Sequence, residues 1–168
     1  MYITPLEAHD LALSTSNGHT AQLRSLVTKL AQREGKSPAD ILLNLRDDFN
    51  QTLAHTASKA GQIASIQTLA DLLHTRSNKT LFFNLPNRFT GDRPVHTAMR
   101  LGYMSVLKVL VENGADPTAT NRFGDTVEDY LGDFEEGEVR GVVEGYLRGL
   151  AGGSGSSRDE DLGVKCGK

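Results

Sequence analysis

One short phrase occurs three times in this chain, and its spacing constrains the fold more than any other feature. The phrase is clearest in NRFTGDRPVHT (87–97) and NRFGDTVEDYL (121–131), where Asn-Arg-Phe precedes a glycine, an aspartate and the expected start of a helix. A weaker copy, DDFNQTLAHTA (47–57), has Asn50 where the glycine stands. Asparagine is the usual substitute where the backbone takes a positive φ. The copies begin at residues 47, 87 and 121, which is the spacing of a repeat array.

Each unit of the array has the apolar pattern of a helical hairpin. Longer amphipathic helices are predicted where apolar residues recur at helical spacing, in 23–30, 63–73, 104–110 and 139–150. Shorter helical segments precede them, at about 5–16, 52–60, 94–101 and 126–135. Glycine is favoured just past a helix end, because it adopts the left-handed conformation at little cost. The glycines that close or nearly close the short segments are Gly18, Gly61, Gly102 and Gly137.

The third unit, GDRPVHTAMRLGYMSVLKVLVENGADPTATN, resembles an ankyrin repeat over its full length, with Pro-Val-His-x-Ala, a glycine turn and Asn-Gly-Ala-Asp. The second unit has TLAHTA, with Leu53 in place of the proline, and the fourth has Asp129 at the histidine position. The resemblance implies an all-α ankyrin-repeat solenoid of about four helix-turn-helix units with short β-like fingers. It covers 1–151, in units of about 5–46, 47–86, 87–120 and 121–151. We expect 152–168 to be a disordered tail, because Gly, Ser and charge alternate there without an apolar period.

Two insertions lengthen the units, because the glycine turns at 18, 61 and 102 lie further apart than the 33 residues of an ankyrin repeat. In the first insertion, Ser37 followed by Pro38 and Asp40 has the pattern of a capped helix start, so 38–45 is predicted to be helical. Its apolar residues are Ile41, Leu42 and Leu45. In the second insertion, Leu81, Phe82, Phe83 and Leu85 are expected to pack against the long helices.

Composition excludes several classes of function. The 168 residues carry a formal charge of −3 and no long apolar run, so we expect no nucleic-acid partner and no membrane partner. No secretion signal is recognised at the start, and the single cysteine, Cys166, forms no disulfide framework. We therefore expect a cytoplasmic or nuclear protein that is monomeric by itself. Cys166 is expected to be exposed and incidental.

Catalytic and metal sites are not expected. No nucleophile elbow and no phosphate-binding loop occurs, so we predict no enzyme activity and no cofactor. His55 and His96 stand one repeat apart and could in principle hold a metal, but zinc needs three or four ligands and no third one is placed near them. In the ankyrin pattern this histidine and the nearby threonine hydrogen-bond the backbone of the turn, and we favour that interpretation.

The strongest candidates for a binding site are Phe49, Phe89 and Phe123, one in each finger. Resemblance to the family implies that the fingers and the exposed side of the short helices form the concave binding surface. Aromatic and arginine side chains are the usual anchors of protein interfaces. In the alternative interpretation each ring seals the joint to the next finger, and the sequence leaves both open. The remaining candidates are Ser16, Asn17, Asp48, Gln51, Lys59, Arg88, Asp92, Arg100, Leu101, Arg122 and Asp125.

The sequence therefore predicts a non-enzymatic module that binds another protein through the concave face of the fingers and short helices. A second hypothesis is an assembly chaperone or inhibitor that shields a basic client, as some small stand-alone ankyrin-repeat proteins with acidic tails do. Acidic residues 159–161 give this second hypothesis weak support. The third hypothesis, kept only as a nominal competitor, is that the protein is a small hydrolase or transferase.

Glycine recurs every four residues in the terminal helix, at Gly137, Gly141, Gly145 and Gly149. These positions lie about 180–240° around the helix from the stripe centred on Val139, Val143 and Leu150. Each glycine costs roughly 1 kcal/mol against alanine in a helix interior. We therefore expect a marginal capping helix that frays before the others.

Overall fold

The computed structural model describes residues 3–130 and 136–152, and in this part of the chain every element is helical. The α-helices, in chain order, are α1 (Pro5–Ser16), α2 (Thr20–Glu34), α3 (Pro38–Asn44), α4 (Leu53–Lys59), α5 (Ile63–Leu73), α6 (Arg76–Phe83), α7 (Pro94–Arg100), α8 (Met104–Glu112) and α9 (Glu136–Gly152). One 3-10 helix, η1 (Val127–Tyr130), precedes α9. Gly152, the first residue of the expected tail, is the last residue of α9, and the rest of that tail, 153–168, lies outside the described residues. No helix in the described ranges is both long and apolar enough to cross a membrane.

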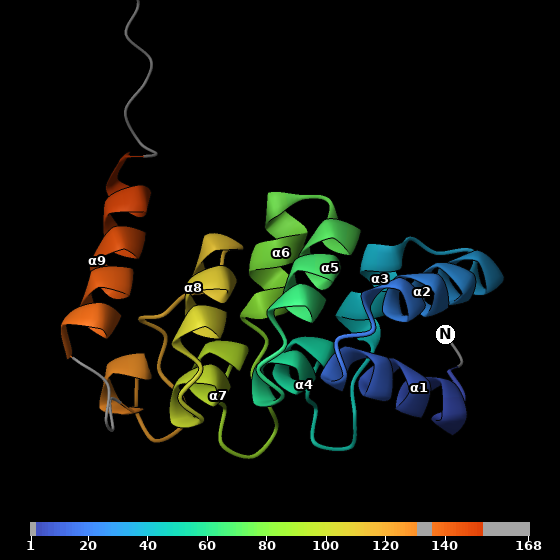
Figure 1. Cartoon of the computed structure of the whole chain (residues 1–168), viewed down its shortest axis with the longest axis horizontal. Helices are drawn as coiled ribbons and strands as arrows, with labels where there is room; N and C mark the ends of the chain where they lie inside the picture. Colours follow the sequence, from blue (N-terminus) through green and yellow to red (C-terminus); the bar gives the residue numbers. More distant parts are fainter. Residues whose placement is uncertain (1–2, 131–135, 153–168) are drawn as a thin grey trace, which may run out of the picture.

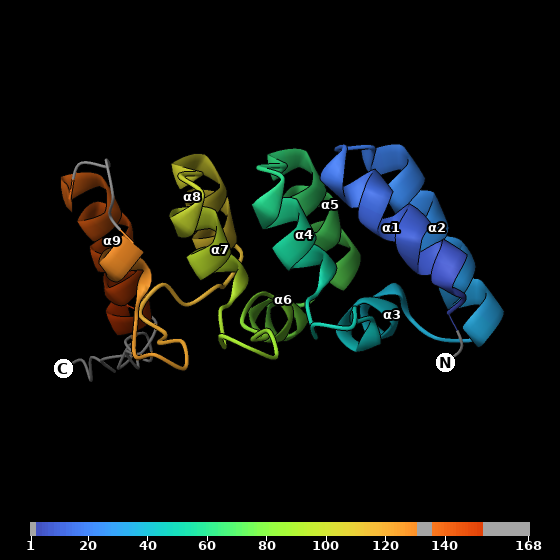
Figure 2. The same ribbon diagram turned by 90° about the horizontal axis from the view of Figure 1, so that it is seen from below.

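The helices form a row of hairpins (Figure 1). The short helices α1, α4 and α7 contact one another in sequence, and so do the long helices α2, α5 and α8. The inserted helices α3 and α6 contact each other and pack on the long helices, where they make a third layer (Figure 2). The repeat architecture predicted from the spacing of the phrases is therefore confirmed.

Local sequence accounts for most helix ends. The Ser37 side chain accepts a hydrogen bond from the Asp40 N–H, and the Asp40 carboxylate accepts from the Ser37 N–H, so α3 begins with a complete capping box. The helix predicted at 38–45 is confirmed to within a residue. Asn50 has φ +58° at the position where Gly91 has φ +71°, so the predicted equivalence of Asn50 to that glycine is also confirmed.

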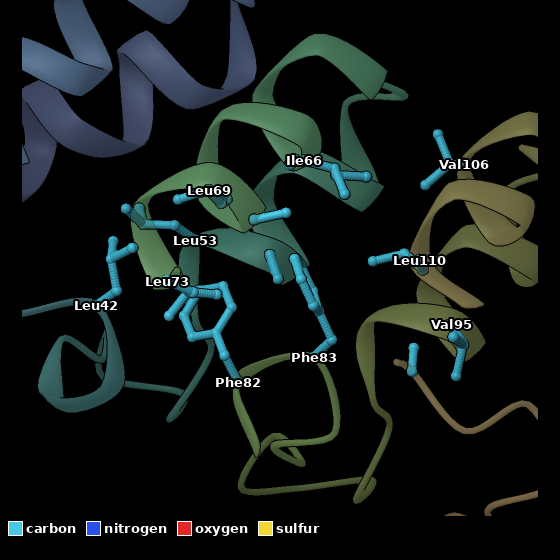
Figure 3. Packing of buried hydrophobic residues seen from close by; sticks show 14 of the residues in the cluster. Leu42, Leu53, Ile66, Leu69, Leu73, Phe82, Phe83, Val95, Val106 and Leu110 are labelled. Atoms are coloured by element: carbon cyan, nitrogen blue, oxygen red, sulfur yellow. The ribbon is translucent and has the colours of Figure 1, made fainter. Parts of the chain in front are cut away.

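The second insertion forms a helix, α6, that the sequence analysis left unassigned. Phe82 and Phe83 are fully buried and make an edge-to-face pair with ring centroids 5.3 Å apart. Figure 3 shows both rings projecting from α6 into the core cluster. Leu85 packs partly buried against this cluster. The expectation for Leu81 was wrong, because its side chain is 55% exposed on the outer side of α6.

The fourth unit departs most from the expected pattern. Its short segment, predicted as a helix over 126–135, is the single 3-10 turn η1, and 131–135 lie outside the described residues. Gly137 does not close that segment, because it lies in the first turn of α9. The fingers contain no assigned strand in the described ranges, so the expected β-like fingers are hydrogen-bonded turns.

Candidate functional site

The repeated phrase forms the same turn in each finger because its first residue caps the turn. The Asp47 carboxylate accepts hydrogen bonds from the Phe49 and Gln51 N–H groups, at 2.9 and 2.7 Å. The Asn121 side-chain oxygen accepts from the Phe123 and Asp125 N–H groups, at 2.8 and 3.0 Å. Asn87 caps the middle finger in a similar way. These are Asx turns, in which a short polar side chain satisfies backbone donors two to four residues on.

The two repeat histidines join each short helix to the next finger. Nδ1 of His55 accepts a hydrogen bond from the Thr52 N–H at 3.1 Å, so its Nε2 carries the proton. That Nε2 donates to the Asp92 carbonyl oxygen at 3.0 Å. His96 repeats the arrangement one unit further on, from the Arg93 N–H to the carbonyl of Asp125. The expected hydrogen-bonding role of both histidines is confirmed, and it extends to the finger of the following repeat.

Burial keeps both histidines neutral. It lowers the pKa of His55 from 6.5 to about 4, against the opposing effect of the hydrogen bond to the Asp92 carbonyl and of nearby carboxylates. Burial also lowers the pKa of His96. In the described part of the chain no group of three or more potential ligands is placed to hold a metal ion.

Neighbouring fingers are tied directly as well. The Arg88 N–H donates to the Phe49 carbonyl, and the Arg122 N–H donates to the Thr90 carbonyl, both at 2.9 Å. One backbone hydrogen bond therefore joins the first finger to the second, and another joins the second to the third. The row of fingers is held in register by these bonds together with the histidine contacts.

The three phenylalanines remain on the surface of this framework. The exposed fractions of Phe49, Phe89 and Phe123 are 53%, 62% and 73%. The rings of Phe49 and Phe89 contact each other, with centroids 5.8 Å apart and planes at 54°. The described residues show no such ring contact between Phe89 and Phe123, so the ladder expected from the sequence contains one ring pair and one separate ring.

Asp92 is a correction to the expected surface, because its side chain is fully buried. Its carboxylate accepts hydrogen bonds from Arg100 Nη1 at 2.7 Å and from Asn121 Nδ2 at 3.0 Å. Burial by itself raises the pKa of this carboxyl, but hydrogen bonds from Asn121 and Thr90 and the charge of Arg100 outweigh it and hold the pKa below its usual value. Asp92 therefore links the second finger to the third and does not contact a partner directly.

The other candidates fall into two groups. Asp48, Arg88 and Arg122 are exposed on the fingers, and Gln51 is half-buried there. Asp125 is half-buried and accepts a hydrogen bond from the Tyr130 hydroxyl. The second group stands at the ends of the short helices and comprises Ser16, Asn17, Lys59, Arg100 and Leu101, with Ser16 half-buried and the others exposed. An ion pair between Arg100 of α7 and Asp92 of the second finger connects the short helices to the fingers.

Sequence reasoning missed three exposed apolar side chains: Leu6 and Leu13 on α1, and Tyr103 beside the glycine turn of the third unit. Leu6 and Leu13 lie seven residues apart and so on one face of α1, opposite the buried Leu11. That spacing was a signal in the sequence. We use the name finger face for the exposed candidates of both groups together with Phe49, Phe89 and Phe123.

Comparison with known proteins agrees with this geometry. The family model for ankyrin repeats (3 copies) matches residues 11–121. A curated protein of Caenorhabditis elegans, the ankyrin repeat and LEM domain-containing protein 2 homolog, is 27% identical over 125 residues, which cover 62% of this chain and 21% of that protein. The chain thus spans about a fifth of the length of this relative.

Among solved structures, a chain in the crystal structure of the yeast ribosomal protein Rps3 in complex with its chaperone Yar1 superposes with a TM-score of 0.68. The match covers 95% of this chain and 100% of the other at 21% sequence identity, so it supports the fold alone. Most of the described chain lies within the family match. The chain belongs to the ankyrin-repeat family, whose repeats mediate contacts between proteins.

Proposed function

We propose that this protein binds a partner protein through the finger face and carries out no chemistry of its own. The observation that supports this most is the exposure of one phenylalanine on each of three consecutive fingers. A phenylalanine side chain is among the largest apolar surfaces a protein can bury, and such rings are common anchors of protein interfaces. Exposed rings on neighbouring fingers therefore favour contact with another protein.

Rigidity of the fingers supports the same proposal. All three fingers are capped by their first residue, and backbone hydrogen bonds join the first finger to the second and the second to the third. His55 and His96 of the preceding units also hold the second and third fingers. A surface that is already ordered loses little conformational entropy when a partner binds. The phenylalanines are thus presented on a fixed framework.

The alternative interpretation, in which each ring seals the joint between two fingers, has less support. The fingers are already connected by the polar contacts, and all three rings remain more than half exposed. Only Phe49 and Phe89 contact each other across two fingers. A ring that served only to seal a joint would be buried by it.

The second hypothesis, a chaperone or inhibitor that shields a basic client, is consistent with one comparison. The similar solved chain comes from a complex between a ribosomal protein and its chaperone. The finger face gives this hypothesis no electrostatic support, because its exposed charged candidates are four bases against one acid, Asp48. The four bases are Lys59, Arg88, Arg100 and Arg122. We therefore keep the general protein-binding proposal as the first.

A matched pair of variants tests the proposal. Phe89→Ser/Phe123→Ser removes two exposed rings from the finger face, and Leu81→Ser removes an exposed apolar side chain of similar exposure from α6. Proteins captured from the native extract by the wild type are identified, and the affinity of each purified partner is then measured for all three chains. Removal of an interface anchor typically costs at least 2 kcal/mol, so we expect affinity to fall about 30-fold or more for the double variant.

Thermal unfolding of each variant separates binding from folding. We expect the double variant to melt within a few degrees of the wild type and Leu81→Ser to bind normally. Retained binding by a destabilised double variant would show that the rings are joints, and the proposal would then fail. If the affinity of the wild type also falls steeply as salt rises, the basic-client hypothesis gains over the first.

A further inference from the structure

An open cleft of about 680 Å³ lies between α9 and the neighbouring helices, away from the finger face. One wall is the side of α9 that carries Gly141, Gly145 and Gly149, with Val142 and Tyr146 beside them. The opposite wall comes from the second half of α8 and from the start of α6. Figure 1 shows α9 beyond α8 at the end of the row. The volume is within the range of natural ligand-binding pockets.

The glycines explain why the cleft is open. A Cβ atom built at any of the three would have no other atom within 4 Å, apart from the helix's own neighbouring backbone. The backbone of α9 is therefore bare along this wall. The glycines face away from Val139, but they lie next to Val142 and Tyr146. Because those two side chains are half-buried where α9 packs on α8, the glycines border the contact between the two helices.

The wall opposite α9 is positively charged. Arg76, Lys79 and Lys108 line the cleft, together with His74, while Glu112 is the one carboxylate among its lining residues. The Lys79 ammonium is positioned by a hydrogen bond to the Asn113 side chain, at 3.3 Å. Glu138 of α9 lies 4.0 Å from the Lys108 ammonium, where it offsets part of that charge. This local excess of positive charge stands in a chain whose formal charge is −3. The occupant that fits is an acidic segment with an apolar side chain.

We propose that the cleft is the docking site for residues 159–162 of the same chain, Asp-Glu-Asp-Leu. The acidic residues face the cationic wall, and Leu162 packs against Val142 and Tyr146. Six residues, 153–158, lie between Gly152 and Asp159, and the seven Cα–Cα steps from Gly152 to Asp159 span up to about 23 Å when extended. The distance along α9 from Gly152 back to Gly141 is only about 16 Å. The connection is therefore longer than the stretch of α9 that lines the cleft.

Covalent linkage makes this contact possible without high intrinsic affinity. A segment joined by a short connection has an effective concentration of order mM near its site. Docking adds apolar contacts to α9, whose glycines otherwise weaken it. It also sequesters the acidic triplet, so a basic client in the second hypothesis would have to compete for it. The inference does not depend on the finger face.

The experiment uses Cys166, the single cysteine of the chain, as the attachment site for a nitroxide spin label. Paramagnetic broadening of backbone amides is then measured in the full-length protein. We expect strong broadening at Lys79, Lys108 and Gly145, and none at Thr28 on the distant α2. Asp159→Asn/Glu160→Gln/Asp161→Asn should remove at least half of the broadening at the cleft, and added salt should reduce it.

Three further measurements make the result decisive. Lys79→Gln should weaken the broadening, whereas Lys29→Gln on α2 should leave it unchanged. Equal broadening in the triple variant, or no broadening at the cleft in the wild type, overturns the proposal. Isotope-labelled chains without the nitroxide are also mixed with unlabelled chains that carry it. Broadening that appears undiminished in this mixture places the segment of a second copy in the cleft and overturns docking within one chain.

Discussion

The buried histidine of the second repeat should make the free energy of unfolding depend on pH in a way that can be measured. His55 is neutral in the folded protein, because its Nδ1 accepts from the Thr52 N–H and its Nε2 donates to the Asp92 carbonyl. Protonation of Nδ1 removes the acceptor for Thr52 and places a positive charge in a buried site. Folding therefore holds the pKa of His55 at about 4, against 6.5 for an exposed histidine, chiefly through burial.

The sign and size of the effect follow from this difference. Between pH 6.5 and about pH 4 the unfolded chain binds a proton at His55 and the folded chain does not, so the free energy of unfolding falls as the pH falls. Each pH unit in this window costs about 1.4 kcal/mol. From neutral pH to about pH 4.5 the loss from this one group is about 2.5 kcal/mol, and well above pH 6.5 it is absent.

Urea unfolding at a series of pH values measures the effect in the wild type and in His55→Gln. Glutamine does not titrate, so we expect the stability of the variant to fall by about 2.5 kcal/mol less than that of the wild type over the same window. At neutral pH the variant is less stable by about 1–3 kcal/mol, because hydrogen bonds of the histidine are lost. His9→Gln, on the exposed side of α1, is the matched control, because it removes a histidine from outside the core. Parallel pH profiles for His55→Gln and the wild type would refute the reasoning.

Two further predictions concern the third and fourth units. Asp92→Asn should lower the free energy of unfolding by about 1.5–3 kcal/mol, because a buried hydrogen bond to a charged group is lost. Asp48→Asn, on the exposed preceding finger, should change the free energy of unfolding little. Urea titration measures both variants, and equal effects would contradict the buried role of Asp92. Gly141→Ala should raise the protection of α9 amides against hydrogen exchange by about 1 kcal/mol, because alanine is the better helix former and its Cβ meets no neighbouring atom. If α9 in the wild type is already as protected as α8, the marginal stability expected for α9 is wrong.

The repeat architecture could be predicted because its signals are local. The Asx turns of the fingers, the capping box of α3 and the positive φ of Asn50 each depend on residues a few positions apart. Such contacts form in the same way in each repeat, so the sequence pattern reveals them directly. The hydrogen-bonding role of His55 came from the ankyrin resemblance, and the structure added its acceptor in the next finger.

Burial at the contacts between repeats could not be predicted in the same way. The sequence treated Asp92 as equivalent to exposed acids of other fingers, but Asn121 and Arg100 approach it from the third finger and from α7, and they enclose its carboxylate. Leu81 was grouped with Phe82 and Phe83, although a helix of this length turns one of the three side chains away from the core. The exposed fraction of a residue depends on which neighbour packs on it.

Local hydrogen bonding and apolar spacing thus determined, from the sequence alone, that this chain is a row of helical hairpins with capped fingers. The tertiary structure alone decided which finger residues stay exposed, that the glycines of α9 line a cleft, and that positive charge faces them from α6 and α8. The physical reason is that helix starts and turns are fixed by contacts within a few residues. Surfaces and clefts arise between segments that lie far apart in the chain, and their character is set only when those segments pack.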